Sequence, residues 1–303
     1  MSTDTLEPTS SGPAGSQRSL YELEPTARRR RIKSRVMAMV LLGAVIGGVV
    51  PLVIILWQVV VNSGEAFGWS FLTEVEPLSY REAGGGYLHG IWGTVYTTGI
   101  AALMVIPLGI AAAVYLVEEG GTWFARVVRF FTDVMTGVPS IFVGLAVYAI
   151  LVTRLRFGTF TGAVALGIIM LPIIVRTAEE MLHQVPPDLR NASFGLGARR
   201  WQTTLKVVIP AAGPGIITGC MLAIARGAGE TAPLILTALG ARTVVMAFQG
   251  GNGQADIGLL MTDGLRQPFD AGIERAWAGG LTLISLVLIL TIVARLINKR
   301  SQI

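Results

Sequence analysis

Two oppositely charged residues in a strongly apolar stretch could act together in this chain. Arg226 and Glu230 are four residues apart, so a helix would place both on one face, where they could form an ion pair. Ionised groups are costly within a membrane span and normally face a cavity or a partner. Because the planar guanidinium group bonds two oxygens at once, Arg226 is suited to phosphate or carboxylate. Glu230 would partly neutralise Arg226 and prevent an anion from being held too tightly. These residues fit a polar substrate path, and an ion pair that only supports packing is the alternative.

Arg176 is a second candidate for the substrate path. It lies near the end of another apolar segment, with Glu179 and Glu180 close behind it. The three-residue spacing predicts an ion pair between Arg176 and Glu179 on a helix. Snorkelling of Arg176 to the inner membrane interface is an alternative to substrate contact, and both interpretations stay open. Asp133 is expected to favour the start of the third apolar segment. Gly137 and Pro139 are expected to interrupt the helix of that segment.

Membrane-spanning helices must position these side chains. Hydrophobic residues make up 52% of the chain and charged residues 14%, against about 25% charged residues in soluble domains. Crossing the hydrocarbon core takes roughly 20 apolar residues. Six segments reach that length: 36–61, 88–117, 127–152, 160–182, 207–239 and 277–297. The sequence therefore predicts an all-α integral membrane protein with six transmembrane helices.

The basic residues predict how these spans are oriented. Arg28–Arg31, Lys33 and Arg35 precede the first apolar segment, which places that end in the cytoplasm. A nucleic-acid site is the alternative for such a cluster, but the topological role is simpler beside a span. Six spans then place both termini in the cytoplasm and residues 62–87 outside. Residues 1–27 hold few large apolar groups and are expected to be disordered. We therefore divide the chain into a basic-ended tail, 1–35, and a membrane domain, 36–303.

The cytoplasmic loop after the fourth span carries a recognisable spacing. Its candidate residues are Asn191, Ala192, Ser193, Gly197, Ala198 and Arg199, followed by an aliphatic-x-aliphatic-Pro ending at Pro210. This pattern resembles the "EAA loop" of ABC importer permeases, which forms short helices that dock onto a cytoplasmic ATPase. The family's leading Glu is Asn191 here and its second Ala is Ser193, and Asn is also able to cap a helix. The resemblance places the turn of the docking helix at Gly197.

A second motif resembles a narrower family. The run Ala225-Arg226-x-x-Gly229-Glu230-Thr231-Ala232-Pro233-Leu234 is similar to the signature of phosphate-specific importer permeases. Segments 93–96, 107–116 and 137–141 are similar to that family in the same order, and the resemblance covers about residues 85–300. The PstA-type subunit fits better than its PstC-type partner.

This resemblance implies a fold, a function and a set of partners. The fold is that of type I ABC importer permeases, with six transmembrane helices and cytoplasmic coupling helices. Thr231 joins Arg226, Glu230 and Arg176 as a substrate-path candidate. The implied partners are a PstC-type permease, a PstB-type ATPase dimer and a PstS-type external phosphate-binding protein. The implied location is a bacterial cytoplasmic membrane, where the chain would form half of a path for inorganic phosphate.

Several other kinds of site find no support in the sequence. None of the three lysines lies in a G-x-x-x-x-G-K-[ST] loop, and no H-E-x-x-H or G-x-S-x-G motif occurs. Cys220 is the single cysteine, and His89 and His183 are far apart, so no disulfide or metal cluster is expected. We therefore predict a transporter subunit without catalytic residues or a cofactor of its own. ATP and Mg²⁺ would bind the partner ATPase.

Three rival functions stay open. A permease for another oxyanion (sulfate, molybdate or phosphonate) would keep the architecture and change the substrate. An intramembrane enzyme would need a catalytic set. A membrane scaffold would account for the spans but not for the spacing of the cytoplasmic loop.

Overall fold

The computed structural model describes residues 24–248, 251 and 253–300, and these residues form helices and connecting loops without a β-strand. The first half of the chain contains α1 (Glu24–Ser63), η2 (Gly64–Ala66), α2 (Trp69–Thr73), α3 (Leu88–Glu118), α4 (Trp123–Gly137), α5 (Ser140–Val147), η3 (Tyr148–Val152) and α6 (Thr153–Leu155). The second half contains α7 (Thr159–His183), α8 (Pro187–Gly195), α9 (Arg200–Thr203), η4 (Thr204–Val208), α10 (Ile209–Ala228), α11 (Ala232–Thr237), α12 (Ile257–Leu265) and α13 (Asp270–Arg300).

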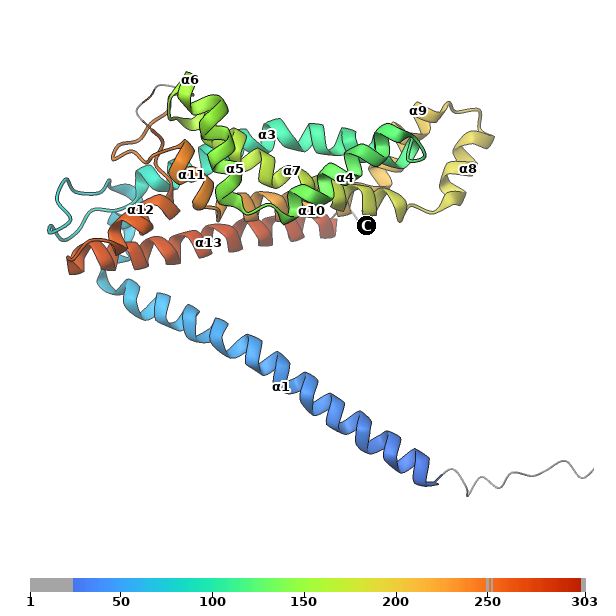
Figure 1. The fold of residues 1–303 in the computed structure, drawn as a ribbon, viewed down its shortest axis with the longest axis horizontal. Helices are drawn as coiled ribbons and strands as arrows, with labels where there is room; N and C mark the ends of the chain where they lie inside the picture. Colours follow the sequence, from blue (N-terminus) through green and yellow to red (C-terminus); the bar gives the residue numbers. More distant parts are fainter. Residues whose placement is uncertain (1–23, 249–250, 252, 301–303) are drawn as a thin grey trace, which may run out of the picture. The chain divides into compact units, whose positions relative to one another are not determined.

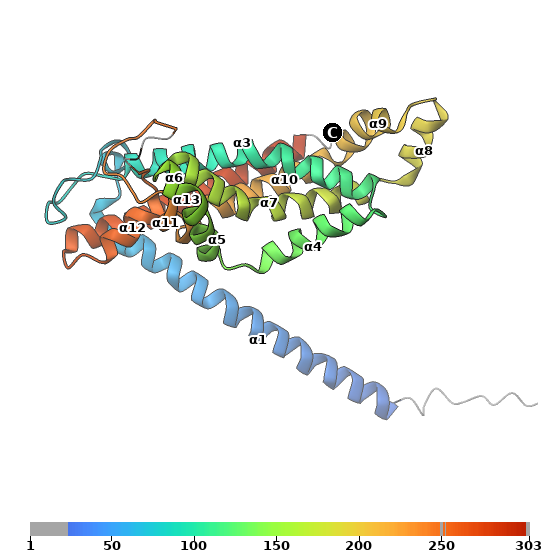
Figure 2. The same cartoon turned by 45° about the horizontal axis from the view of Figure 1, so that its top comes forward.

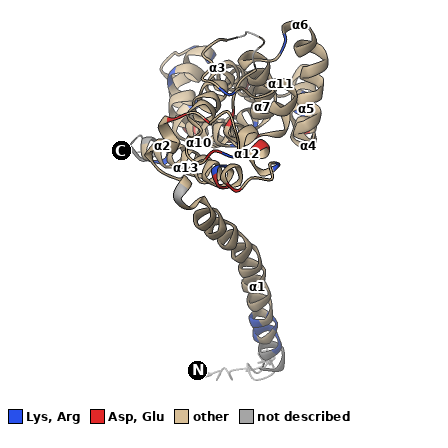
Figure 3. Ribbon diagram, turned by 90° about the vertical axis from the view of Figure 1, so that its left-hand side faces the viewer, with Lys and Arg blue, Asp and Glu red and all other residues tan. Residues whose placement is uncertain are grey.

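The chain divides after Trp57 into two units, and α1 forms the described part of the first. Helix α1 begins at Glu24, so residues 24–35 are helical and not part of a disordered tail. Arg and Lys are good helix formers, and Pro25 lies in the first turn, where a missing N–H is tolerated. Figure 3 shows the basic residues at the start of α1 and an uncharged helix beyond them. Residues 1–23 of the predicted tail lie outside the described residues.

The core of the second unit is built on α7, which packs against α3 and α10 (Figure 1). Small residues let α10 approach α7 closely, as is common between membrane helices. A side chain at Gly219 would overlap Thr177, and one at Gly215 would overlap Met181. The fully buried Leu166 belongs to the resulting apolar core. Helix α13 packs along α10.

Within the described part of the chain, five helices are long and apolar enough to cross a membrane. Helices α4 and α5 supply a sixth span only when taken together, and they are bent by 109° at their junction. The interruption predicted at Gly137 and Pro139 is therefore confirmed, and residues 127–152 do not form one continuous helix. Val138 is extended (φ −74°, ψ 125°), as expected for a residue that precedes a proline. Asp133 lies well inside α4 and does not start a helix.

The predicted span over 207–239 is also broken. Helix α10 ends at Ala228 with Gly229 as its C-cap, and α11 starts at Ala232 with Pro233 in its first turn. Glycine favours helix ends and proline favours helix starts, so the sequence itself explains the break. The last span begins at Asp270, ahead of the expected residue 277.

The loop 239–276 contains the short helix α12, and buried polar contacts anchor its start. Asp256 caps α12 by accepting a hydrogen bond from the Gly258 N–H at 2.8 Å. Its other carboxylate oxygen accepts from the Thr94 hydroxyl of α3 at 2.7 Å, and that hydroxyl accepts from the Ile257 N–H at 3.0 Å. Burial raises the pKa of Asp256 to about 6. The loop before α12 is thus fixed to α3.

A buried arginine fixes the neighbouring loop, 74–87. Arg275 of α13 donates hydrogen bonds to the carbonyls of Glu82 at 2.6 Å and Gly84 at 3.2 Å. The carboxylate of Glu76 lies 3.8 Å from Arg275 Nε. Burial raises the pKa of Glu76, and the nearby charge of Arg275 opposes that shift. This loop therefore belongs to the folded core of its end of the bundle.

Candidate functional site

The break between α10 and α11 places the first two candidate residues. Arg226 lies in the last turn of α10 and Glu230 follows the helix, yet their side chains form an ion pair at 3.3 Å. The predicted pair is confirmed, whereas the prediction that one helix carries both residues is wrong. The Gly229 N–H donates to the Arg226 carbonyl, and the Glu230 N–H donates to the Gly227 carbonyl. These two hydrogen bonds form the turn that brings the Arg226 and Glu230 side chains together. The Arg226 side chain is 58% exposed and that of Glu230 is 18% exposed, so the arginine presents its charge outward.

A cavity of about 300 Å³ lies at the α4–α5 break, and Arg226 reaches it. Its walls are otherwise uncharged: Met135, Thr136, Val138, Ser140, Phe142, Val143, Ala146, Ile168, Ile169, Pro172 and Ile173. A groove between α10 and α13 also includes Arg226, together with Gly229 and Leu283. A guanidinium group at an otherwise uncharged cavity gives it a positive potential that attracts anions.

Thr231 is placed differently from its neighbour Glu230. It precedes α11 as the N-cap residue, and its side chain forms no capping hydrogen bond. A side chain at Gly258 would overlap the Thr231 hydroxyl, so Thr231 packs against the start of α12. Thr231 does not line the cavity that holds Arg226.

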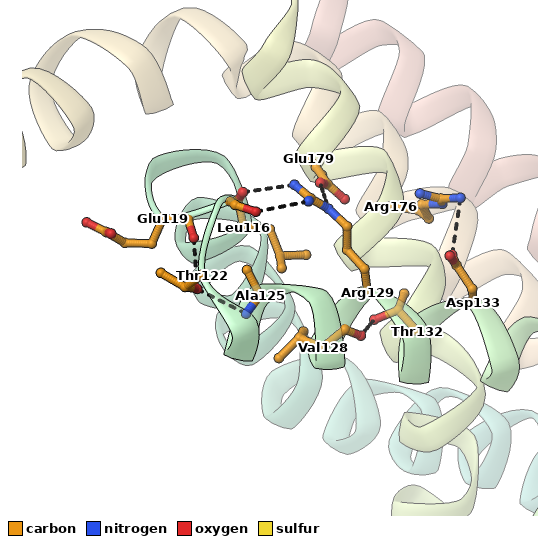
Figure 4. A network of polar contacts seen from close by, with 11 residues as sticks. Leu116, Glu119, Thr122, Ala125, Val128, Arg129, Thr132, Asp133, Arg176 and Glu179 are labelled. Carbon is orange, nitrogen blue, oxygen red and sulfur yellow. Dashed lines mark hydrogen bonds and ion pairs between the residues drawn. The ribbon is translucent and has the colours of Figure 1, made fainter.

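Arg176 belongs to a second polar group, between α4 and α7 (Figure 4). It forms an ion pair with Asp133 at 3.1 Å, while Glu179 pairs with Arg129 at 2.8 Å. The predicted pair between Arg176 and Glu179 is therefore wrong, because α4 offers each of them a partner of opposite charge. Arg176 lies one turn beyond Ile173, which lines the cavity.

Arg129 was not predicted from the sequence as a candidate, and Asp133 has a role that differs from the predicted one. Arg129 and Asp133 have opposite charges and are four residues apart on α4. Arg176 and Glu179 likewise have opposite charges and are three residues apart on α7, so each helix carries one such pair on one face. That charge pattern was the available signal. It could not be interpreted without knowing that α4 and α7 lie side by side.

The predicted docking loop forms two short helices, α8 and α9, which with their connecting turn we call the coupling segment (187–203). Asn191 lies inside α8 and does not cap it, because Pro186 is the N-cap residue and Pro187 starts the helix. Gly197 has φ +83°, a left-handed conformation that favours glycine, so the turn predicted there is confirmed. Ala192, near the middle of α8, is exposed.

Polar contacts hold the two helices of the coupling segment together. The hydroxyls of Ser193 in α8 and Thr203 in α9 are 2.9 Å apart and share a hydrogen bond. Arg199 is the N-cap residue of α9, and its backbone N–H donates to the Gln202 side chain at 2.8 Å. Ala198 precedes it and is partly exposed.

Apolar side chains project from the coupling segment. Leu196 is 90% exposed, and Leu189, Phe194 and Trp201 are exposed as well. Large apolar groups gathered on a polar loop are typical of a protein-binding surface. The segment is also tied to the core, since Glu118 of α3 accepts hydrogen bonds from Arg190 at 2.9 Å and Thr204 at 3.1 Å.

Comparison with known proteins identifies the family of this chain. The family model described as "Binding-protein-dependent transport system inner membrane component" matches residues 105–303. The chain belongs to this family. It is 38% identical over 279 residues to "Phosphate transport system permease protein PstA 1" of Mycobacterium tuberculosis (strain CDC 1551 / Oshkosh), covering 90% of this chain and 91% of the relative. It is 36% identical over 275 residues to "Phosphate transport system permease protein PstA" of Yersinia pestis, covering 90% and 92%.

Two solved transporters share its fold. A bacterial alginate ABC transporter, in complex with an alginate pentasaccharide-bound periplasmic protein, matches with a TM-score of 0.63 at 15% identity, covering 90% of this chain and 96% of that chain. The MetNI methionine ABC transporter in an inward-facing conformation matches with a TM-score of 0.57 at 18% identity, covering 71% and 95%.

Family membership confirms several of the predictions. The predicted resemblance to PstA-type ABC importer permeases is confirmed, and so is the all-α fold of type I importers. The chain is a multi-pass membrane protein and a transporter subunit, as its relatives are, rather than an enzyme. The roles of the individual site residues stay predictions.

Proposed function

We propose that this chain is a permease subunit of an ATP-driven importer of inorganic phosphate. The observation that carries the proposal is the exposed guanidinium of Arg226, which faces an otherwise uncharged cavity at the breaks of two membrane helices. Relatives named phosphate transport permeases cover 90% of the chain at 36% and 38% identity, which supports phosphate over sulfate, molybdate or phosphonate. The chain would form half of the translocation path.

The proposed complex contains partners of three kinds. A homologous permease of the PstC type completes the path, and a PstS-type protein delivers phosphate from outside. A dimer of PstB-type ATPases binds ATP and Mg²⁺ and docks on the exposed apolar side chains of the coupling segment. ATP binding and hydrolysis move that segment, and alternating access follows. Arg226 attracts the anion, and Glu230 weakens the attraction enough for release.

The decisive experiment uses the complete complex in liposomes. Phosphate, sulfate, molybdate and a phosphonate are compared as solutes, each measured by uptake and by ATPase activity. We expect phosphate alone to drive both. Stimulation by another of these anions would replace phosphate in the proposal, and failure to co-purify with an ATPase would favour a scaffold.

Substitutions test the path itself. Arg226→Ala should reduce phosphate uptake at least about tenfold, since a lost charged hydrogen bond costs more than about 1.4 kcal/mol. Assembly should persist, because the Arg226 side chain is largely exposed. Glu230→Gln should change the uptake rate, in a direction set by whether release limits the cycle. Arg266→Ala, at an exposed position outside the cavity, is the control. If assembled Arg226→Ala complexes take up phosphate normally, the ion pair between Arg226 and Glu230 has only a structural role.

The proposed location is the bacterial cytoplasmic membrane, with both termini inside. Single cysteines at Glu74 and Ser193, introduced in a Cys220→Ala background, should react with membrane-impermeant reagents from opposite sides. Glu74 follows α2, and Ser193 lies in the coupling segment. Reaction of both positions from outside would contradict this topology.

A further inference from the structure

Two ion pairs of alternating sign join α4 to α7. Arg129 Nε donates to Glu179 Oε1 at 2.8 Å, and Arg176 Nη2 lies 3.1 Å from Asp133 Oδ1. The order along each helix is basic then acidic, and the helices pair in opposite directions. A slip of one turn would therefore bring like charges together, so the pairs select one register. We call these four residues the α4–α7 clamp (Figure 4).

Helix α4 has little apolar packing to hold it in place. Its buried residues are Ala125 and Thr132, while the rings of Trp123, Phe130 and Phe131 are exposed. An element with few buried apolar contacts shifts at low free-energy cost. Polar contacts therefore decide where α4 lies within the unit.

Arg129 also joins α4 to the end of α3. Besides its bond to Glu179, it donates to the Leu116 carbonyl at 3.0 Å and to the Gly120 carbonyl at 3.4 Å. The same last turn of α3 carries Glu118, which accepts hydrogen bonds from the coupling segment and η4. One helix turn thus contacts α4 on one side and the coupling segment on the other.

The far end of α4 forms part of the cavity wall. Met135, Thr136 and Val138 line the cavity that Arg226 reaches. Asp133 lies less than one turn before Met135, so the clamp ends next to that wall. A continuous series of contacts therefore runs from the coupling segment, through the end of α3 and the clamp, to the cavity.

We propose that the α4–α7 clamp positions the cavity wall and transmits movement of the coupling segment to it. Its four residues are positioning residues for transport, and this role rests on the proposed function. The half-exposed Arg176–Asp133 pair contributes little to stability. Its contribution is to the register of α4 and hence to the coupling of ATP hydrolysis to transport. Glu179 is buried, so loss of Arg129 would leave an unpaired charge and lower the amount of folded protein.

The exposed pair therefore gives the sharper test. Asp133→Asn, Arg176→Gln and the charge-conserving double variant Asp133→Glu/Arg176→Lys are assembled into the complete complex in liposomes. The quantity measured is the ATP hydrolysed per phosphate imported. We expect each single variant to raise this ratio about fivefold, a typical size for coupling between sites. The charge-conserving variant keeps the alternating signs on both helices and should keep the ratio near that of the unchanged protein. Arg126→Gln is the matched control, because Arg126 is an exposed arginine of α4 that forms no ion pair among the described residues.

A second readout does not depend on the solute. Spin labels at the exposed positions Val134 of α4 and Glu180 of α7, in a Cys220→Ala background, report the distance between the two helices. We expect a narrow distance distribution in the otherwise unchanged protein, a broader one in each single variant, and a narrow one again in the charge-conserving variant.

The two readouts separate the possible failures. A complex that imports no phosphate would refute the proposed function, and the label distances alone would then decide the clamp. Single variants that keep a narrow distribution would overturn the clamp. Broadened distances with an unchanged ratio of ATP to phosphate would overturn its role in coupling, as would a charge-conserving variant whose ratio rises as much as that of the single variants.

Discussion

The two ends of the helical bundle in the second unit are built in opposite ways. Helix α12 lies at one end, and the coupling segment lies at the other (Figures 1 and 2). At the α12 end, Asp256, Arg275 and Tyr87 are buried among the loops that join the helices. At the other end, α8 has no buried residue and Leu196 is 90% exposed.

This contrast indicates different tasks for the two ends. A buried polar group is costly unless its partners stay in place, so the α12 end holds a single arrangement. Exposed apolar groups gain stability only when something covers them, so the coupling segment is completed by a partner. Substitutions at the α12 end should therefore affect folding, and substitutions in the coupling segment should affect assembly and transport.

The largest effect is expected where α3 meets the loop before α12. A side chain at Gly93 would overlap the backbone carbonyl of Ala255. Gly93→Ala should therefore remove most of the protein from the membrane, because backbone atoms cannot yield as a flexible side chain can. Membrane abundance and thermal unfolding are the measurements.

Gly99→Ala is the control on the same helix. Nothing lies within 4 Å of a side chain placed at Gly99, so this change should be neutral or slightly stabilising. Equal abundance of the two variants would contradict the close contact between α3 and Ala255.

Gly197→Asp should have a smaller effect on folding and a clear effect on transport. Gly197 has open space around it but a φ of +83°, so a side chain strains the backbone without a collision. We expect normal membrane abundance, weaker binding of the ATPase and reduced phosphate uptake, which co-purification and transport assays would measure.

Gly195→Asp separates charge from backbone strain. Gly195 is the last residue of α8, has open space and lacks a positive φ. The Gly195→Asp variant should therefore bind the ATPase more strongly than the Gly197→Asp variant does. Normal abundance, binding and uptake in Gly197→Asp would remove the coupling role of this turn.

Local patterns in the sequence predicted much of this molecule. Apolar length predicted most of the spans, and the spacing around Gly197 predicted a turn that the structure contains. Gly137 and Pro139 predicted the break in the third span, whereas the break after Gly229 was missed, because hydropathy averages over a window and Gly229 acts at a single position. Membrane helices often tolerate glycine, so its presence alone did not indicate a helix end.

Contacts between distant residues could not be predicted in this way. Thr94 and Asp256 are 162 positions apart, and nothing in either local sequence identifies the other as its partner. Arg176 illustrates the same limit, since its nearest acidic residue along the chain, Glu179, pairs with Arg129 of another helix. The residues next to a charged side chain along the sequence are known in advance. The residues that contact it in space depend on how the helices pack against one another.

The smallest expected effect is the pH dependence of the α12 end. Burial raises the pKa of Asp256 from 3.8 to about 6, so the folded state favours the protonated carboxyl group. The stabilising contribution is fully present below the unfolded pKa and is lost as the pH rises through about 6. Asp256→Asn removes this titration and keeps a side chain able to cap α12. The Tm of the unchanged complex in detergent, minus that of the variant, should therefore fall between pH 4 and pH 7 and stay level above. Taking this difference cancels the titration of Glu76, whose raised pKa is common to both proteins. Parallel curves across the range would mean that Asp256 is not buried as the structure has it, and the contrast between the two ends would lose its strongest electrostatic support.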